Sequence, residues 1–310
     1  MSTWIELLEQ VTRLEPGPPR DNWFNDHLRS GLEAIGTIRG GRNVMLYASA
    51  FLQKPQVPGE MIMITAEDLN GLMATIKGMD WANGLTLLLH TPGGVTMAAQ
   101  TMVEYLRSKF DDIEVIVPTF AMSAGTMISL AADRIVMGNH SQLGPIDPQL
   151  AINGRQFSAK SIVDQFKKAH DEILANPVAA HVWAPILASQ GPSLLQYAED
   201  QLAFSEQMVS EWLAKYMMAR AVDPAAEGKR IAAFFNDASN HKSHDKRIGI
   251  EEATASGVVV EKLEDDQALQ EAVLTLYHVV TILIEQSAIT KVISSTTGQS
   301  WLKSWTGSQT

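Results

Sequence analysis

Two short glycine-bearing turns hold the residues of this sequence whose types best suit chemistry. The first, TPGG, contains Gly93 and Gly94 and comes shortly after the apolar run LTLLL. The second, MSAG, contains Ser123 and Ala124 and comes shortly after the apolar run IEVIV. A serine at the start of a helix can act as a nucleophile, and glycines leave backbone N–H groups pointing outward to bind an oxyanion. Together the two turns predict a site for acyl transfer.

Each turn alone has an ordinary structural explanation. A serine in the position of Ser123 is most often a helix N-cap, and a glycine pair most often makes a tight turn. Their pairing on successive strands favours a site. If the N–H groups of Gly94 and Ala124 converge, they form a two-donor oxyanion hole beside Ser123, with Gly93 allowing the chain to turn.

The surrounding pattern predicts an α/β fold. Strand-like apolar runs at 85–89, 113–117 and 135–138 alternate with helical segments, which indicates parallel strands covered on both faces. Ligands in such sheets bind at the carboxyl ends of the strands, and both glycine turns lie there. Thr65 and Asp68 offer a variant capping box for a helix before the first of these runs. Beyond Gln149 the pattern is mainly helical.

Composition excludes several kinds of site. The sequence has no cysteine, so thiolate metal sites, disulfides and a cysteine nucleophile are absent. The net charge of −11 disfavours nucleic acid as a partner. The hydropathy pattern predicts no membrane span, and the start of the chain does not read as a secretion signal. We therefore expect a cytoplasmic protein.

Four segments, TPGGV, AMSAGT, AADRIVM and SQLGPIDPQ, together resemble the ClpP/crotonase-fold serine peptidases. The sequence is most similar to their serine dehydrogenase proteinase (SDH) branch, which is related to signal peptide peptidase A. The likeness runs from about residue 43 to 149 and, more faintly, through HDKRIGIEEATASGV. It implies a spiral of repeated β-β-α units, with Ser123 as the nucleophile and Gly94 and Ala124 as the oxyanion hole. No GxGxxG fingerprint supports redox chemistry, and the resemblance implies no cofactor.

The resemblance also implies a division of the chain and its partners. We expect an N-terminal arm at 1–42, a ClpP/crotonase-like peptidase domain with a helical elaboration at 43–263, and a C-terminal helical extension at 264–310. Substrates would be peptides or unfolded proteins, and the protein would be a homo-oligomer. The apolar segment at 274–284 could pack on a neighbouring subunit or be buried within its own.

The general base is the open question of this sequence. Clp-type peptidases have a histidine where this chain has Gly144 and Pro145, and no lysine lies between residues 175 and 191, where signal peptide peptidase A would supply one. The candidates that remain are His244, Lys160, Lys167 and His140. We rank His244 first and Lys160 second, and Asp147 could orient the base.

Alternatives remain for these residues and for the whole protein. An exposed histidine run is usually a solvated loop, and a helix lysine usually faces solvent. His241, His244 and Asp245 lack the further ligands of a zinc site, so we expect no metal. AMSAG is also close to the GxSxG turn of an α/β-hydrolase-type esterase but lacks its first glycine. A crotonase-type acyl-CoA enzyme would not use a serine nucleophile. A chain that lacks a base would be a catalytically silent scaffold or peptide-binding oligomer.

Overall fold

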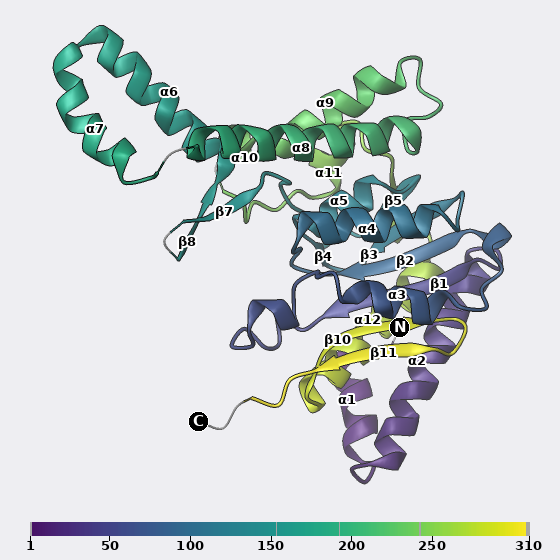
Figure 1. The fold of residues 1–310 in the computed structure, drawn as a ribbon. Coiled ribbons are helices and arrows are strands. Elements are labelled where there is room, and N and C mark those ends of the chain that lie inside the picture. Colours follow the sequence, from purple (N-terminus) through teal and green to yellow (C-terminus); the bar gives the residue numbers. More distant parts are fainter. Residues whose placement is uncertain (1, 153, 192, 242, 308–310) are drawn as a thin grey trace. The chain divides into compact units, whose positions relative to one another are not determined.

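The computed structural model describes residues 2–152, 154–191, 193–241 and 243–307, except for the side chains of residues 239 and 240. The chain forms two compact units (Figure 1). Unit 1 comprises Met1–Leu143 and Ile248–Thr310, and unit 2 comprises Gly144–Arg247. Each unit is described by itself.

A seven-stranded sheet in the order β11-β10-β1-β2-β3-β5-β9 is the centre of unit 1. Within this sheet the neighbours β1, β2, β3, β5 and β9 pair in parallel. Strand β10 is antiparallel to both β1 and β11. Two short strands, β4 and β6, form a parallel pair beside it. The strands are β1 (Asn43–Ser49), β2 (Leu85–His90), β3 (Ile113–Val117), β4 (Phe120–Ala121), β5 (Arg134–Met137), β6 (Gln142–Leu143), β9 (Val260–Lys262), β10 (Ile289–Ser295) and β11 (Ser300–Ser304).

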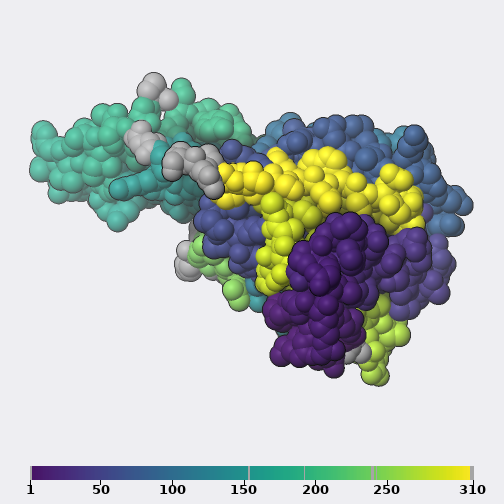
Figure 2. All heavy atoms as spheres, turned by 90° about the horizontal axis from the view of Figure 1, so that it is seen from below, coloured from purple at the N-terminus to yellow at the C-terminus, as the bar shows by residue number. Residues whose placement is uncertain are grey.

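Helices cover both faces of this sheet (Figure 1). On one face α1, α2 and α12 share a buried apolar cluster with β1 and β10. Figure 2 shows the N-terminal helices, in purple, against the C-terminal segment, in yellow. On the other side α3 packs on β10 and β11, and α4 contacts α3 and α5. The helices are α1 (Trp4–Thr12), α2 (Pro18–Ile38), α3 (Asp68–Ile76), α4 (Thr96–Arg107), α5 (Ala124–Leu130), α11 (Ile250–Ala255) and α12 (Gln267–Gln286).

Unit 2 is mainly helical. The β7–β8 hairpin leads into α6, which packs on α8, and α8 packs on α9 along much of its length. One buried apolar cluster of unit 2 contains Leu150, Ala159, Ile162 and Ala198. By contrast, α7 has no buried residue. The elements are β7 (Gln149–Ile152), β8 (Arg155–Ser158), α6 (Ala159–Ala175), α7 (Ala180–Ala188), α8 (Leu194–Lys215), α9 (Pro224–Asn236) and α10 (Ala238–His241).

The predicted α/β class is confirmed. The apolar runs at 85–89 and 113–117 are β2 and β3, and every residue of both strands is buried. Because helices cover both faces, these parallel strands are continuously apolar rather than alternating, which is what made them visible in the sequence.

The two ends of the chain differ from the sequence-based prediction. The first 42 residues, predicted as an N-terminal arm, include α2, which begins at Pro18 and packs on α12 in the core of unit 1. Its prolines stand at the first helical positions, where a missing N–H costs nothing, so they start a helix as well as ending the previous one. The last residues are not wholly helical, since β10 and β11 add a hairpin to the main sheet. The two compact units therefore do not follow the predicted boundaries at 42 and 263.

Helix α12 contains the apolar segment 274–284, whose packing the sequence left open. Most of its large apolar side chains are buried within unit 1, among them Leu276, Val279 and Ile282. By length and composition alone α12 is also apolar enough to cross a membrane, which for a single helix is weak evidence of a span. Half of the relevant window is buried in the structure, as in the core helix of a soluble protein, which passes the same test.

Candidate active site

The two glycine turns lie side by side at the carboxyl ends of β2 and β3. Thr91 and Ala121 form a parallel bridge, with the Thr91 N–H donating to the Phe120 carbonyl at 2.9 Å and the Met122 N–H donating to the Thr91 carbonyl at 3.1 Å. A Cβ placed on Gly93 would lie 2.7 Å from Ser123 Cβ and 3.1 Å from the Ala124 nitrogen. The structure therefore brings Gly93, Ser123 and Ala124 together.

Ser123 has an unusual backbone conformation. Its φ of 51° and ψ of −116° lie in a region of backbone conformation that residues other than glycine rarely adopt. It occupies the N-cap position of α5, yet its side chain makes no capping hydrogen bond. Its hydroxyl, half-buried, donates to no described residue. The ordinary explanation of this serine as a helix cap thus fails, and its hydroxyl, unbonded among the described residues, stands at the positive end of a helix.

Two backbone N–H groups near Ser123 are also unused. The N–H groups of Gly94 and Ala124 bond to no described residue. Each belongs to a peptide whose carbonyl is held, since the Gly93 carbonyl accepts from the Ile64 N–H at 2.8 Å and the Ser123 carbonyl accepts from the Met127 N–H at 3.0 Å. In a trans peptide the carbonyl and the N–H point in opposite directions, so these bonds set the directions of both donors.

Both positions of the first turn require glycine. Gly93 and Gly94 have φ values of 98° and 154°, and a Cβ on Gly94 would collide with the backbone N and O of Ile64. Ile64 and Gly94 form a parallel bridge in which the Val95 N–H donates to the Ile64 carbonyl at 2.9 Å. The chain segment at Ile64 therefore braces the turn from the side.

A histidine–aspartate pair lies in unit 2. His244 Nδ1 is 2.8 Å from Asp147 Oδ1, although the two residues are far apart in the sequence. The Asp147 side chain is fully buried and its other oxygen accepts from Gln149 Nε2 at 2.8 Å. A carboxylate that accepts from Nδ1–H fixes the tautomer and leaves Nε2 as the proton acceptor. The structure therefore joins the first-ranked base to the residue predicted to orient it.

The other candidates are placed less favourably. Lys160 pairs with Asp164 one turn along α6, and an ion-paired ammonium has no lone pair with which to accept a proton. Lys167 and His140 are exposed. His241 points into unit 2, with Nε2 2.7 Å from the Phe234 carbonyl, rather than toward a shared ligand with His244. Among the described residues no group of histidine and acidic side chains could hold a metal ion.

His90 was not identified from the sequence. It is the last residue of β2, directly before the first turn, and only 1% of it is exposed. Its Nδ1 lies 2.8 Å from Thr119 Oγ1, its ring contacts Phe51 and Tyr277, and its Nε2 is buried without a described partner. Burial lowers the pKa of His90 to about 3, so the ring is neutral near pH 7. In the sequence, the local sign of this residue is a histidine directly after the apolar run LTLLL.

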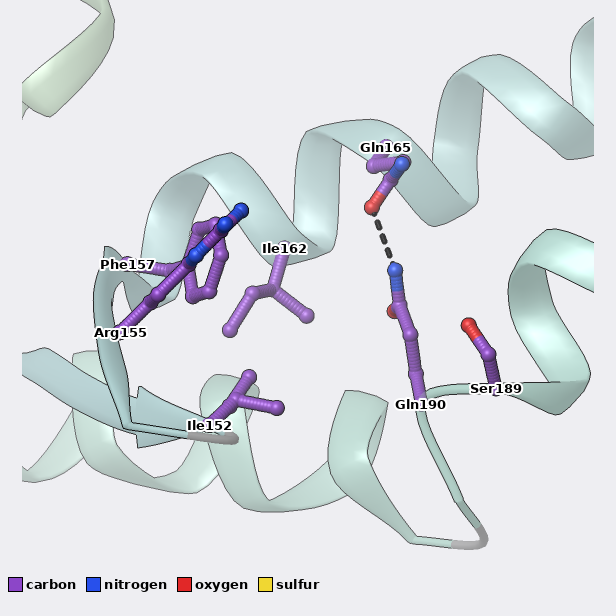
Figure 3. Close-up of a pocket in the computed structure, with 7 residues that line it drawn as sticks. All are labelled: Ile152, Arg155, Phe157, Ile162, Gln165, Ser189 and Gln190. Carbon is purple, nitrogen blue, oxygen red and sulfur yellow. Dashed lines mark hydrogen bonds between the residues drawn. The ribbon is translucent and has the colours of Figure 1, made fainter.

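A cavity of about 430 Å³ lies elsewhere in unit 2 (Figure 3). Apolar side chains from β7, β8 and α6 line one part of it, and Gln190 donates to Gln165 Oε1 at 2.7 Å across another. The lining residues are Ile152, Arg155, Phe157, Ile162, Gln165, Ser189 and Gln190. None of the candidate catalytic residues lines this cavity, so it adds nothing to the assignment of the site.

Comparison with known families identifies the domain. Residues 57–209, about half of the chain, match the family of ClpP-like SDH-type serine proteinases. The chain carries an SDH-type serine proteinase domain. The match includes both glycine turns and Asp147, and it confirms the resemblance seen in the sequence. The match also makes the α/β-hydrolase alternative unnecessary, because a ClpP-like fold accounts for the AMSAG turn.

Individual relatives add less to this assignment. Two uncharacterized proteins of Methanocaldococcus jannaschii, MJ0137 and MJ1495, are 40% and 35% identical over 116 and 115 residues, which is 36% of this chain. The matched segment spans only 39% and 38% of their lengths. Among solved structures, two variants of the 1510-N membrane-bound stomatin-specific protease align with TM-scores of 0.39. They are 20% and 18% identical and cover 79% of this chain, and 89% and 84% of their own.

Proposed function

We propose that this protein is a serine peptidase that cleaves peptide bonds through an acyl-enzyme on Ser123. The observation that carries the proposal is the Ser123 hydroxyl, in a strained backbone conformation, beside two backbone N–H groups, none of which bonds to a residue that the structure describes. A strained residue is a reason to look for function, and a helix cap does not explain this one. The SDH-type family supplies the reaction class.

In the proposed reaction the Ser123 hydroxyl attacks the carbonyl carbon of the scissile peptide bond. His244 Nε2 accepts the hydroxyl proton, while Asp147 holds Nδ1–H and stabilises the imidazolium. The tetrahedral oxyanion accepts hydrogen bonds from the Gly94 and Ala124 N–H groups. The proton then passes from His244 to the leaving amine, and water hydrolyses the ester in a second cycle of the same steps. The proposal requires His244 to come within hydrogen-bond reach of Ser123 in the active enzyme.

Covalent labelling tests the nucleophile. A fluorophosphonate probe should label the wild-type protein and should not label Ser123→Ala. Ser108→Ala, which removes an exposed serine at the end of α4, is the matched control and should label normally. A folded wild-type protein that stays unlabelled at every pH would reject the peptidase assignment and favour the silent scaffold.

The same assay tests the base. His244→Ala should slow labelling by about a thousandfold, because general-base catalysis of this kind supplies roughly 10²–10⁴ in rate. Lys160→Ala should label at the wild-type rate. If Lys160→Ala alone abolished labelling, the assignment of His244 would be wrong.

We also propose that the protein forms a homo-oligomer, and exposed apolar side chains of unit 2 support this proposal. The exposed apolar side chains of unit 2 include four on α6, on α7 and in the turn between them: Leu174 (71%), Val178 (68%), Val182 (64%) and Ile186 (38%). Exposed apolar patches on a protein surface often mark the sites where a partner binds. Val182→Glu should reduce the mass measured by light scattering, whereas Val222→Glu, at another exposed valine of unit 2, should not. An unchanged mass for Val182→Glu would reject this region of unit 2 as the interface. Cytoplasmic location stays a prediction from the sequence.

A further inference from the structure

Three polar side chains that belong to neither glycine turn form a buried cluster in unit 1. Lys291 on β10 and Asp68 at the start of α3 are 0% exposed, and Tyr47 on β1 is 1% exposed. Lys291 Nζ lies 2.8 and 2.9 Å from the two Asp68 oxygens, and the Tyr47 hydroxyl donates to Asp68 Oδ2 at 2.8 Å. Asp68 is thus held from two strands of the sheet.

Asp68 in turn holds the chain that leads to Ile64. Asp68 Oδ2 accepts from the Thr65 N–H at 2.9 Å, which completes one half of the capping box predicted from the sequence. The other half is missing, because Thr65 Oγ1 is buried without a described partner. The Asp68 carboxylate is therefore the side-chain anchor of this turn.

The next link reaches the proposed oxyanion hole. Ile64, directly before Thr65, donates its N–H to the Gly93 carbonyl at 2.8 Å. That carbonyl belongs to the same planar trans peptide as the Gly94 N–H, so its bond to Ile64 sets the direction in which the Gly94 N–H points. Glycines on both sides of this peptide leave it free to rotate unless something holds it.

We propose that Lys291, Asp68 and Tyr47 are positioning residues that orient the Gly94 N–H through Thr65 and Ile64. This inference rests on the proposed function, because it concerns a donor of the proposed oxyanion hole. The three residues do not touch substrate. They fix a backbone segment, and that segment fixes the donor.

The chemistry of the cluster supports a role in geometry rather than in stability. Burying an ion pair costs desolvation free energy, and well-packed apolar side chains are often as stabilising. A carboxylate held by three donor groups, the Lys291 ammonium, the Tyr47 hydroxyl and the Thr65 N–H, has a single position, which apolar packing would not specify as narrowly. Burial lowers the pKa of Lys291, against the opposing effect of Asp68, and raises the pKa of Tyr47. Both shifts reflect removal of the cluster from water.

Two variants and one matched control test the proposal. Tyr47→Phe removes one hydrogen bond to Asp68 and should slow fluorophosphonate labelling of Ser123 by about tenfold. The double variant Lys291→Met with Asp68→Asn removes both charges together, so that neither is left buried alone, and should slow it by roughly a hundredfold, near the effect of losing an oxyanion donor. Thr86→Val is the control: Thr86 is buried on β2 at the end of the strand opposite the turn and donates to Glu114 at 2.6 Å. It should label at the wild-type rate per folded molecule.

Hydrogen exchange gives a readout that does not depend on activity. The Ile64 and Thr65 amides should exchange at least about tenfold faster in Tyr47→Phe and in the double variant than in Thr86→Val at equal global stability. Unchanged exchange of both amides would overturn the proposal even if the protein never labels. Unchanged labelling in both variants, with the wild type labelled at Ser123, would also overturn it and leave the peptidase assignment intact.

Discussion

His90 makes the stability of unit 1 depend on pH in a calculable way. Its pKa is lowered from 6.5 to about 3 by burial in the folded protein. Between these values the unfolded chain binds the proton and the folded protein does not, so stability rises with pH across this window and falls as acid is added. The full shift corresponds to about 5 kcal/mol, at ~1.36 kcal/mol for each pH unit. At about pH 5 the loss relative to about pH 8 should be roughly 2 kcal/mol.

The comparison of His90→Asn with the wild type isolates this contribution. Asparagine can keep the hydrogen bond to Thr119 but does not titrate in this range. Urea unfolding should be monitored through hydrogen exchange of the β2 amides. Between the two pH values the free energy of unfolding of the wild type should fall by about 2 kcal/mol more than that of His90→Asn. His140→Asn, at an exposed histidine, should behave as the wild type does. Equal losses in His90→Asn and the wild type would refute the assignment of a buried neutral histidine.

Three further outcomes are expected at the site. Gly94→Ala should lower the labelling rate by about 10²–10³, because the new Cβ displaces Ile64 and with it the Gly94 donor; a near-normal rate would argue against this N–H as part of the oxyanion hole. Asp147→Asn should lower kcat/KM for a peptide substrate by roughly 10³–10⁴ at neutral pH, since an amide does not hold His244 in the required tautomer, and a loss below tenfold would contradict the dyad. Ser123→Gly should raise the free energy of unfolding by about 1 kcal/mol relative to Ser123→Ala, measured by denaturant titration, because glycine relieves the positive φ; equal stabilities would mean that the residue is not strained.

The parts of the fold that were predictable are those whose signals are local. Buried parallel strands such as β2 and β3 are short continuous apolar runs, which can be recognised without their neighbours. Strand β10 was missed because its sequence, ITKVISS, looks solvent-exposed. Lys291 is buried there only because Asp68, distant in the sequence, accepts its charge. A pattern within one segment cannot reveal a partner in another.

The candidate site divides in the same way. Glycines and a serine at strand ends are visible locally, so Gly93, Gly94, Ser123 and Ala124 were all named from the sequence. The brace at Ile64 was not, because it depends on a backbone bridge between two separate segments. His244 and Asp147 were each named from the sequence, one as a candidate base and the other as a residue that could orient a base, but their pairing came only from the structure.

The chain leaves unit 1 and re-enters it at two residues that are hydrogen-bonded to each other. Leu143 and Ile248, where the chain leaves and re-enters unit 1, form an antiparallel bridge with two backbone hydrogen bonds of 2.9 Å. Because the two ends meet there, a tight turn could replace the whole insertion at little cost in loop closure. Such a shortened protein would keep the proposed nucleophile and both oxyanion donors but lose the proposed base. Activation of the serine and stabilisation of the oxyanion would then be physically separable, and a base supplied from outside, such as imidazole in the buffer, could be assayed for rescue.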